Sequence, residues 1–280
     1  VTAPAGDRGP DPGSVDHYEP WVTTVGATVP SDVPLSGARI YESRVPVPLN
    51  PAASPPRDWR LTRGEHVATF SGRGGPAQPL GISKPDLVAP GAGVLGALAP
   101  GQAGAPESGD KALVGTMSGT AVAAAHVAGA AALLKQLYAD WTPAHLRSAL
   151  MVTAETNSLR QEDGRLGSNS FAAGSGRLDV SEAAQTSLTL TTTAKGLERH
   201  KGDLWNSNYP SIFLPSMPGR IELRRSLHNP TEAGLKWFLS AQAPADLSVA
   251  VPNQLRAQPG EDRLLEITVD ARNVPWGEVR

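Results

Sequence analysis

The 280-residue sequence lacks cysteine, which excludes disulfide bonds, zinc–thiolate sites and a cysteine nucleophile. It also lacks an excess of positive charge, since 25 Lys and Arg residues stand against 27 Asp and Glu residues for a formal net charge of −2. Binding to a nucleic-acid backbone needs a basic surface, so we expect no nucleic-acid partner. The longest apolar run, residues 121–134, is interrupted by His126 and Gly129. Because a membrane span needs about 18 apolar residues, we expect none here.

What is present is a succession of short strands and apolar helices. Residues 21–25 (Trp-Val-Thr-Thr-Val) lack polar alternation, which is typical of a strand covered on both faces in a parallel sheet. Residues 66–70 and 86–89 predict similar buried strands. Residues 120–138 predict a helix that is apolar on nearly every face and therefore buried. A second helix is predicted to begin at Thr142-Pro143, an N-cap followed by proline at the first helical position. Strands interleaved with buried helices indicate an α/β architecture.

Composition divides the chain into three parts. We expect an α/β domain over residues 1–184, in which residues 31–65 form an irregular, proline-rich insertion because proline favours extended or loop structure. Residues 185–205 are predicted to be a polar, β-prone linker. Residues 206–280 are predicted to form a small all-β sandwich, truncated at its end, because apolar residues alternate there with polar ones. The alternating runs are Ile221/Leu223, Leu235/Trp237/Leu239, Leu247/Val249/Val251 and Leu265/Ile267/Val269.

The most informative segment is residues 115–129, Gly-Thr-Met-Ser-Gly-Thr-Ala-Val-Ala-Ala-Ala-His-Val-Ala-Gly. It resembles the nucleophile motif of the subtilisin-like serine proteases (subtilases), Ser-Gly-Thr-Ser-Met-Ala-x-Pro-His-Val-Ala-Gly, whose second serine begins a long buried helix. Residues 84–91 (Lys-Pro-Asp-Leu-Val-Ala-Pro-Gly) and 70–74 (Phe-Ser-Gly-Arg-Gly) match two further motifs in the family's order. The resemblance covers residues 1–184 and implies part of a subtilisin-like parallel sheet with buried helices.

A second resemblance concerns the C-terminal part. Residues 208–212, Asn-Tyr-Pro-Ser-Ile, resemble the opening of the fibronectin type III-like domain that follows the catalytic domain in some larger subtilases. Together the two resemblances imply a polypeptide substrate or peptide ligand and an extracellular or cell-surface location. They also make the N-terminal half of the same protein a candidate partner. We expect no cofactor and no metal site, since the carboxylates show no spacing that demands calcium.

Two positions of the resemblance carry residues that differ from those of an active protease. The family reaction needs a serine nucleophile, a histidine base, an aspartate and an oxyanion donor. Ala121 occupies the nucleophile position, and its methyl group cannot attack a carbonyl carbon. Residues 5–9 read Ala-Gly-Asp-Arg-Gly where the family has Ala-Gly-Asn-x-Gly, so Asp7 puts an acceptor where the amide donor belongs. No Asp-Thr-Gly or His-Gly-Thr-His motif occurs in the sequence. We therefore predict that this serine endopeptidase segment is catalytically inactive.

Neighbouring polar residues have structural interpretations. Neither Ser118, ahead of the helix, nor Thr120 is expected to replace the nucleophile, because an unactivated hydroxyl is a weak one. His126 matches a structural histidine of the family's helix, and its position on the helix does not suit a base. Asp86 is expected to be a buried, hydrogen-bonded structural acid.

Three hypotheses for the function remain open. The chain is a segment of a subtilase whose catalytic histidine and aspartate lie outside it, or a pseudoprotease that binds a peptide or partner protein, or a carrier in which only the β-sandwich acts. The departures from the family motif cluster at Asp7, Ala121, Val122 and Ala125. A single engineered knock-out would change one residue, so this cluster favours natural divergence.

Overall fold

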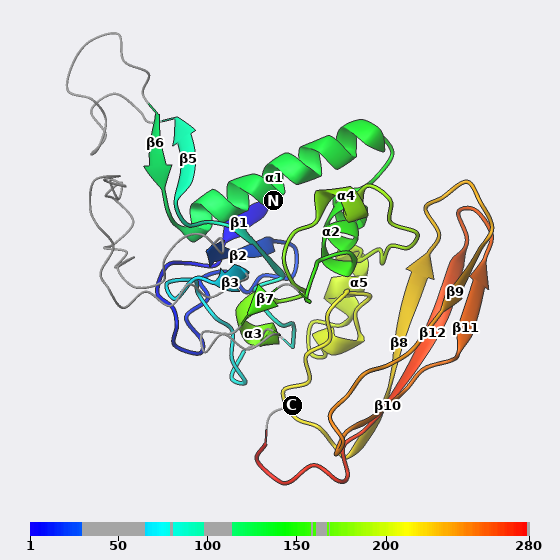
Figure 1. Cartoon of the computed structure of the whole chain (residues 1–280). Helices are drawn as coiled ribbons and strands as arrows, with labels where there is room; N and C mark the ends of the chain where they lie inside the picture. The colour runs from blue at the N-terminus through cyan, green and yellow to red at the C-terminus, as the bar shows by residue number, and fades with distance from the viewer. Residues whose placement is uncertain are drawn as a thin grey trace, which may run out of the picture.

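The fold comes from a computed structural model that describes residues 1–29, 65–78, 81–97, 114–157, 159–160, 167 and 169–278. The predicted insertion at residues 31–65 lies outside these ranges except for Glu65. Figure 1 shows an α/β part formed by the first strands and helices, with a group of antiparallel strands from the C-terminal part beside it.

The α/β part is built on a five-stranded sheet centred on β2. Its strands are β1 (Thr2–Pro4), β2 (Thr23–Val29), β3 (Glu65–Val67), β4 (Leu87–Pro90) and β7 (Leu159–Arg160). β2 runs parallel to β1 and β4 and antiparallel to β3, and β3 is parallel to β7. All seven residues of β2 are buried, as expected for a strand covered on both faces. The predicted strand start at Trp21 was wrong, since that side chain is 66% exposed and β2 begins two residues later.

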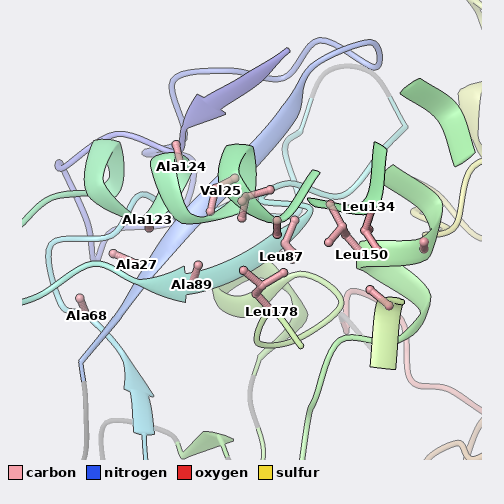
Figure 2. Close-up of a cluster of buried hydrophobic side chains, with 14 of the residues drawn as sticks. Val25, Ala27, Ala68, Leu87, Ala89, Ala123, Ala124, Leu134, Leu150 and Leu178 are labelled. Atoms are coloured by element: carbon pink, nitrogen blue, oxygen red, sulfur yellow. The ribbon is translucent and has the colours of Figure 1, made fainter. Parts of the chain in front are cut away.

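Helix α1 (Thr120–Leu137) covers this sheet, packing on β1, β2 and β4. Figure 2 shows Ala123 and Ala124 of the helix facing Val25 and Ala27 of β2 across the apolar core. The predicted bounds are confirmed, but the prediction of burial on nearly every face was wrong. The buried residues follow one stripe with helical spacing, and they are Thr120, Ala123, Ala124, Val127, Ala130 and Leu134.

The opposite face of α1 is open and apolar. Leu133 is 54% exposed and Leu137 is 64% exposed, and Ala121, Ala125, Ala128 and Ala132 are exposed as well. By length and hydropathy alone α1 would qualify as a membrane span. Its packing along the sheet is that of a core helix covered on one side.

Helix α2 (Pro143–Val152) begins where the sequence predicts. Thr142 is the N-cap, its side chain accepts a hydrogen bond from the backbone N–H of His145, and Pro143 occupies the first helical position. Two one-turn helices, α3 (Ser170–Ala173) and α4 (Val180–Ala183), complete this part. Strands β5 (Val94–Ala97) and β6 (Val114–Met117) pair as an antiparallel ribbon that leads into α1.

The C-terminal part consists of antiparallel strands, and each of the four alternating runs contains one. One sheet has the order β10–β12–β8, from Ser248–Ala250, Asp262–Asp270 and Arg220–His228. The other pairs β9 (Leu235–Phe238) with β11 (Gln254–Ala257), a strand that the alternation did not single out. The alternation is visible in β8, where Leu223, Arg225 and Leu227 are buried and the residues between them are not.

The predicted β-prone linker contains helices. Residues 185–205 include α5 (Ala194–Arg199) and the start of a 3₁₀ turn (Leu204–Asn206). Thr193 caps α5 by accepting the Gly196 backbone N–H, and the segment after it is rich in good helix formers. Because Leu190 and Leu204 are also buried, this segment is a packed part of the fold.

Candidate active site

The candidate site lies at the N-terminus of α1, where the chain makes an unusual turn. The residue before the helix, Gly119, has φ of +148°, a conformation that side-chain-bearing residues rarely adopt. A Cβ atom there would lie 3.2 Å from Oδ2 of Asp7. Glycine therefore permits both the turn and the close approach of the Asp7 loop. Gly119 has no side chain with which to cap the helix, so the first N–H groups need another acceptor.

Asp7 supplies that acceptor from a distant part of the sequence. Its Oδ1 accepts hydrogen bonds from the Thr120 backbone N–H at 2.8 Å and from the Thr120 hydroxyl at 2.9 Å. The Thr120 hydroxyl oxygen in turn accepts the Gly6 backbone N–H at 3.1 Å. These three bonds fasten the Asp7 loop to the first residue of the helix.

The loop itself is anchored on its other side. The Gly9 N–H donates to the Phe70 carbonyl at 2.8 Å, and the Gly72 N–H donates to the Gly6 carbonyl at 2.7 Å. A Cβ on Gly9 would lie 2.1 Å from the Ser71 carbonyl oxygen, so only glycine fits at this position. Arg8 forms an ion pair with Asp16. The position of Asp7 is therefore set by backbone contacts on both sides of it.

Ala121 is the second residue of α1 and its side chain is exposed. The structure thus brings the two residues singled out in the sequence, Asp7 and Ala121, to the same helix terminus. The surface around the Ala121 methyl group is accessible, but neither residue provides a nucleophile or a side-chain N–H donor.

The electrostatics of this terminus follow from the Asp7 carboxylate. The unpaired N–H groups at a helix start carry a partial positive charge of roughly half an elementary charge and attract anions. Here the protein's own carboxylate occupies that position, so a negative charge developing on a substrate would meet a like charge. A neutral asparagine at position 7 would instead be able to direct its amide N–H outward.

The nearby hydroxyl and imidazole groups are engaged elsewhere. The Ser118 Oγ accepts the Gly93 backbone N–H at 2.9 Å. His126 is exposed, and its Nδ1 lies 3.0 Å from the Val122 carbonyl oxygen of its own helix, in keeping with a structural interpretation. The other five histidines lie on other elements, at His17, His66, His145, His200 and His228.

Asp86 is a buried structural acid, as predicted, but its partners were not foreseen. Its Oδ2 lies 2.6 Å from Nζ of Lys84 and accepts the Thr24 backbone N–H at 2.7 Å. Its Oδ1 accepts the hydroxyl of Tyr209 at 2.5 Å, and the guanidinium of Arg147 lies over the Tyr209 ring at 4.5 Å. Burial lowers the pKa of Lys84 and raises the pKa of Tyr209 well above its usual value. The network joins the sheet, α2 and the C-terminal part.

Sequence reasoning missed this network because it rests on contacts between distant residues. The signal was available in part, since Tyr209 belongs to the Asn-Tyr-Pro-Ser-Ile motif and Asp86 to the Lys-Pro-Asp motif. Nothing in either motif alone says that the two meet. Among the residues that the structure describes, there is no group of three His, Asp or Glu side chains arranged to hold a metal ion.

Residues 3–176 match the sequence profile of the subtilase family (peptidase S8). The chain belongs to the subtilase family. Plant relatives include subtilisin-like protease SBT1.6 of Arabidopsis thaliana, 40% identical over 76% of this chain, and SBT5.4 of the same plant, 30% identical over 72%. Subtilisin-like protease SBT3 of Solanum lycopersicum is 36% identical over 68% of the chain. These matches cover 33%, 30% and 30% of the relatives' own lengths, so this subtilase chain spans about a third of each.

Proposed function

We propose that this subtilase chain is proteolytically inactive and descends from a serine endopeptidase. The observation that carries the proposal is the pair at the start of α1. A methyl group stands at position 121, and the Asp7 carboxylate accepts the hydrogen bonds of Thr120 beside it. An acylating site needs a nucleophile and a donor to the oxyanion at this place, and neither Asp7 nor Ala121 supplies a hydroxyl nucleophile or a side-chain donor.

Measured magnitudes from subtilisin, a member of the same family, indicate the size of the effect. Loss of its serine nucleophile lowers kcat by about 10⁶-fold, and loss of one oxyanion donor lowers it by about 10²–10³-fold. Loss of the nucleophile alone therefore leaves only the slow rate that substrate binding and the oxyanion donors provide without a triad. The Asp7 carboxylate adds repulsion where a donor would have stabilised charge.

The proposal is tested by incubating the purified chain with a diverse peptide library and detecting cleavage by mass spectrometry. We expect no cleavage above the buffer blank for the wild type, for Ala121→Ser or for the double variant Asp7→Asn/Ala121→Ser, because the sequence supplies no base motif. Cleavage by the wild type that persists through two orthogonal purification steps would contradict the proposal. A serine protease of known activity, incubated with the same library, serves as the positive control.

A pseudoprotease that binds a peptide or protein is the second candidate function. The exposed apolar face of α1 favours it, since contiguous apolar surface is a common feature of interaction sites. The same library separates the two functions, because a binding protein retains particular peptides uncleaved while an inert segment retains none.

The remaining family properties are part of the same proposal. We propose that residues 206–280 form a fibronectin type III-like unit, supported by the antiparallel strands β8 to β12 and by the Asn-Tyr-Pro-Ser-Ile motif. The ligands of a subtilase site are polypeptides, and the N-terminal half of the same protein is a candidate partner. An extracellular or cell-surface location is supported by resemblance to the family.

A further inference from the structure

We propose that the contact between the start of α2 and strand β8, made by His145 and His228, is an acid-sensitive joint. At neutral pH the joint is closed, which means that the capping hydrogen bond to His145 and the contact of its ring with His228 are both made. Protonation of His145 opens the joint by breaking these contacts. The joint lies away from Asp7 and Ala121, so the proposal does not rest on the proposed function.

His145 takes part in a capping box at the start of α2. The backbone N–H of Thr142 donates to Nδ1 of His145 at 3.2 Å, and the Thr142 hydroxyl lies 2.8 Å from the same nitrogen. The His145 N–H donates to the Thr142 hydroxyl oxygen at 3.4 Å. A backbone N–H can only donate, so Nδ1 of His145 must be the acceptor and the proton of the neutral ring must be on Nε2. Protonation of Nδ1 turns this nitrogen into a donor, which the Thr142 hydroxyl oxygen can accept, but the Thr142 N–H loses its acceptor and one half of the capping box opens.

The neighbouring histidine is His228 on β8. The rings of His145 and His228 meet edge to face with centroids 5.5 Å apart. Nδ1 of His228 lies 2.8 Å from Oδ1 of Asp262 on β12, so the His228 ring has a carboxylate as its partner. Two positive charges at this separation would repel each other, so a charge on His145 is disfavoured by this neighbour.

The surroundings of His145 also disfavour its charge. It is the third residue of α2, where the helix dipole opposes a cation. On its other side its ring stacks on Trp141, with centroids 6.3 Å apart. The charged or titratable groups around it are His228 on β8, Asp262 on β12 and Lys135 on α1, whose Nζ is held by the Trp141 carbonyl. Asp262 is the one anion among them.

The direction of the pH effect follows from the pKa of His145. Partial burial lowers this pKa below its ordinary value of 6.5, and repulsion by His228 acts in the same direction while Asp262 opposes both. The unfolded chain therefore binds the proton more readily than the folded one. Stability from this group is present above about pH 6.5 and is lost as the pH falls through the lowered pKa.

Opening of the contact between His145 and His228 leaves the other links between α2 and β8 in place. The backbone of His228 is bound to Thr189 by two hydrogen bonds of 2.8 and 2.9 Å, and the next residue, Leu190, donates to the Ser148 hydroxyl of α2 at 2.7 Å. Together with the buried Tyr209 network these contacts keep α2 and β8 linked. Acid therefore loosens the first turn of α2 and its contact with β8 while the rest of the junction stays in place.

The variant His145→Gln provides a matched test, because glutamine at this capping-box position offers a side-chain oxygen to the Thr142 N–H but does not titrate. Amide hydrogen exchange is measured at low micromolar concentration at pH 7.5 and 5.0, with intrinsic rates corrected for pH. In the wild type we expect the protection of the Thr142 amide and the first turn of α2 to fall by about fivefold at pH 5.0. In His145→Gln we expect it to stay constant.

The variant His200→Gln is the control, since His200 pairs with Asp203 in another part of the chain and its loss must leave the fivefold change intact. An equal loss of protection in His145→Gln, or no loss in the wild type, would overturn the proposal. A second measurement on the wild type covers the case in which the variant does not fold. Nitrogen-15 NMR must show the Nε2–H form of His145 at pH 7.5 and a pKa of His145 below 6.5. Either the Nδ1–H form or a pKa of 6.5 or above would refute the proposal.

Discussion

At the scale of single residues, the important change is at position 7, where this chain has the carboxylate of Asp7 in place of an asparagine amide. Asparagine and aspartate have nearly the same shape, but the carboxylate accepts hydrogen bonds where the amide NH₂ donates them. In this chain Asp7 uses its oxygen to cap α1, which has glycine rather than a polar side chain at its N-cap. Asp7 thus stabilises the helix start from a distance of 113 residues in the sequence.

The capping role of Asp7 predicts its mutational behaviour. Asp7→Ala should lower the free energy of unfolding by about 1 kcal/mol, because the Thr120 N–H and hydroxyl both lose their acceptor. Asp7→Asn should cost less, since its side-chain oxygen can still accept the Thr120 N–H. Denaturant unfolding of the three proteins measures both differences. Equal stability of wild type and Asp7→Ala would show that the carboxylate does not cap α1.

At the scale of elements, the sequence predicted what depends on local chemistry. The start of α2 was predictable from Thr142-Pro143, and the bounds of α1, to within one residue, from its long and mostly apolar sequence. The burial of α1 was not, because composition shows that a face is apolar but not whether another element covers it. The helix α5 was missed for a related reason, since the threonines before it suggested strand while Thr193 acts as its cap.

The Tyr209 network is the contact between elements with the largest expected energetic effect. Tyr209→Phe should lower the free energy of unfolding by about 1–3 kcal/mol, because it leaves Oδ1 of the buried Asp86 without its hydroxyl donor. Asp86→Asn should cost more, about 3–5 kcal/mol, because it leaves the buried ammonium of Lys84 without its counter-ion. Thermal or denaturant unfolding tests the order of the two.

The matched control for this prediction is Tyr18→Phe, which removes a hydroxyl from a half-buried tyrosine in the loop before β2. It should change the stability by less than Tyr209→Phe. If both variants were equally stable, or if Tyr209→Phe were as stable as the wild type, the network would not hold the C-terminal part to the sheet.

At the scale of the whole molecule, the order of the motifs along the chain was enough to predict the α/β class and the family. It was not enough to predict which residues meet at the centre of the fold. Asp86 and Tyr209 are 123 residues apart, and Asp7 and Thr120 are 113 apart. Contacts of this kind depend on the path of the entire chain, and no local pattern encodes them. The candidate site was predicted better because family motifs name both of its members, Asp7 and Ala121.

We propose that the start of α1 differs from that of an active protease at more than the nucleophile position. Labelling with a fluorophosphonate, which reacts only with an activated serine, tests this most directly in the Ala121→Ser variant. With active subtilisin as the positive control, we expect no label at position 121, because the sequence contains no base motif to activate the new hydroxyl and the Asp7 carboxylate would repel the developing charge. Stoichiometric labelling at position 121, located by peptide mass spectrometry, would contradict it.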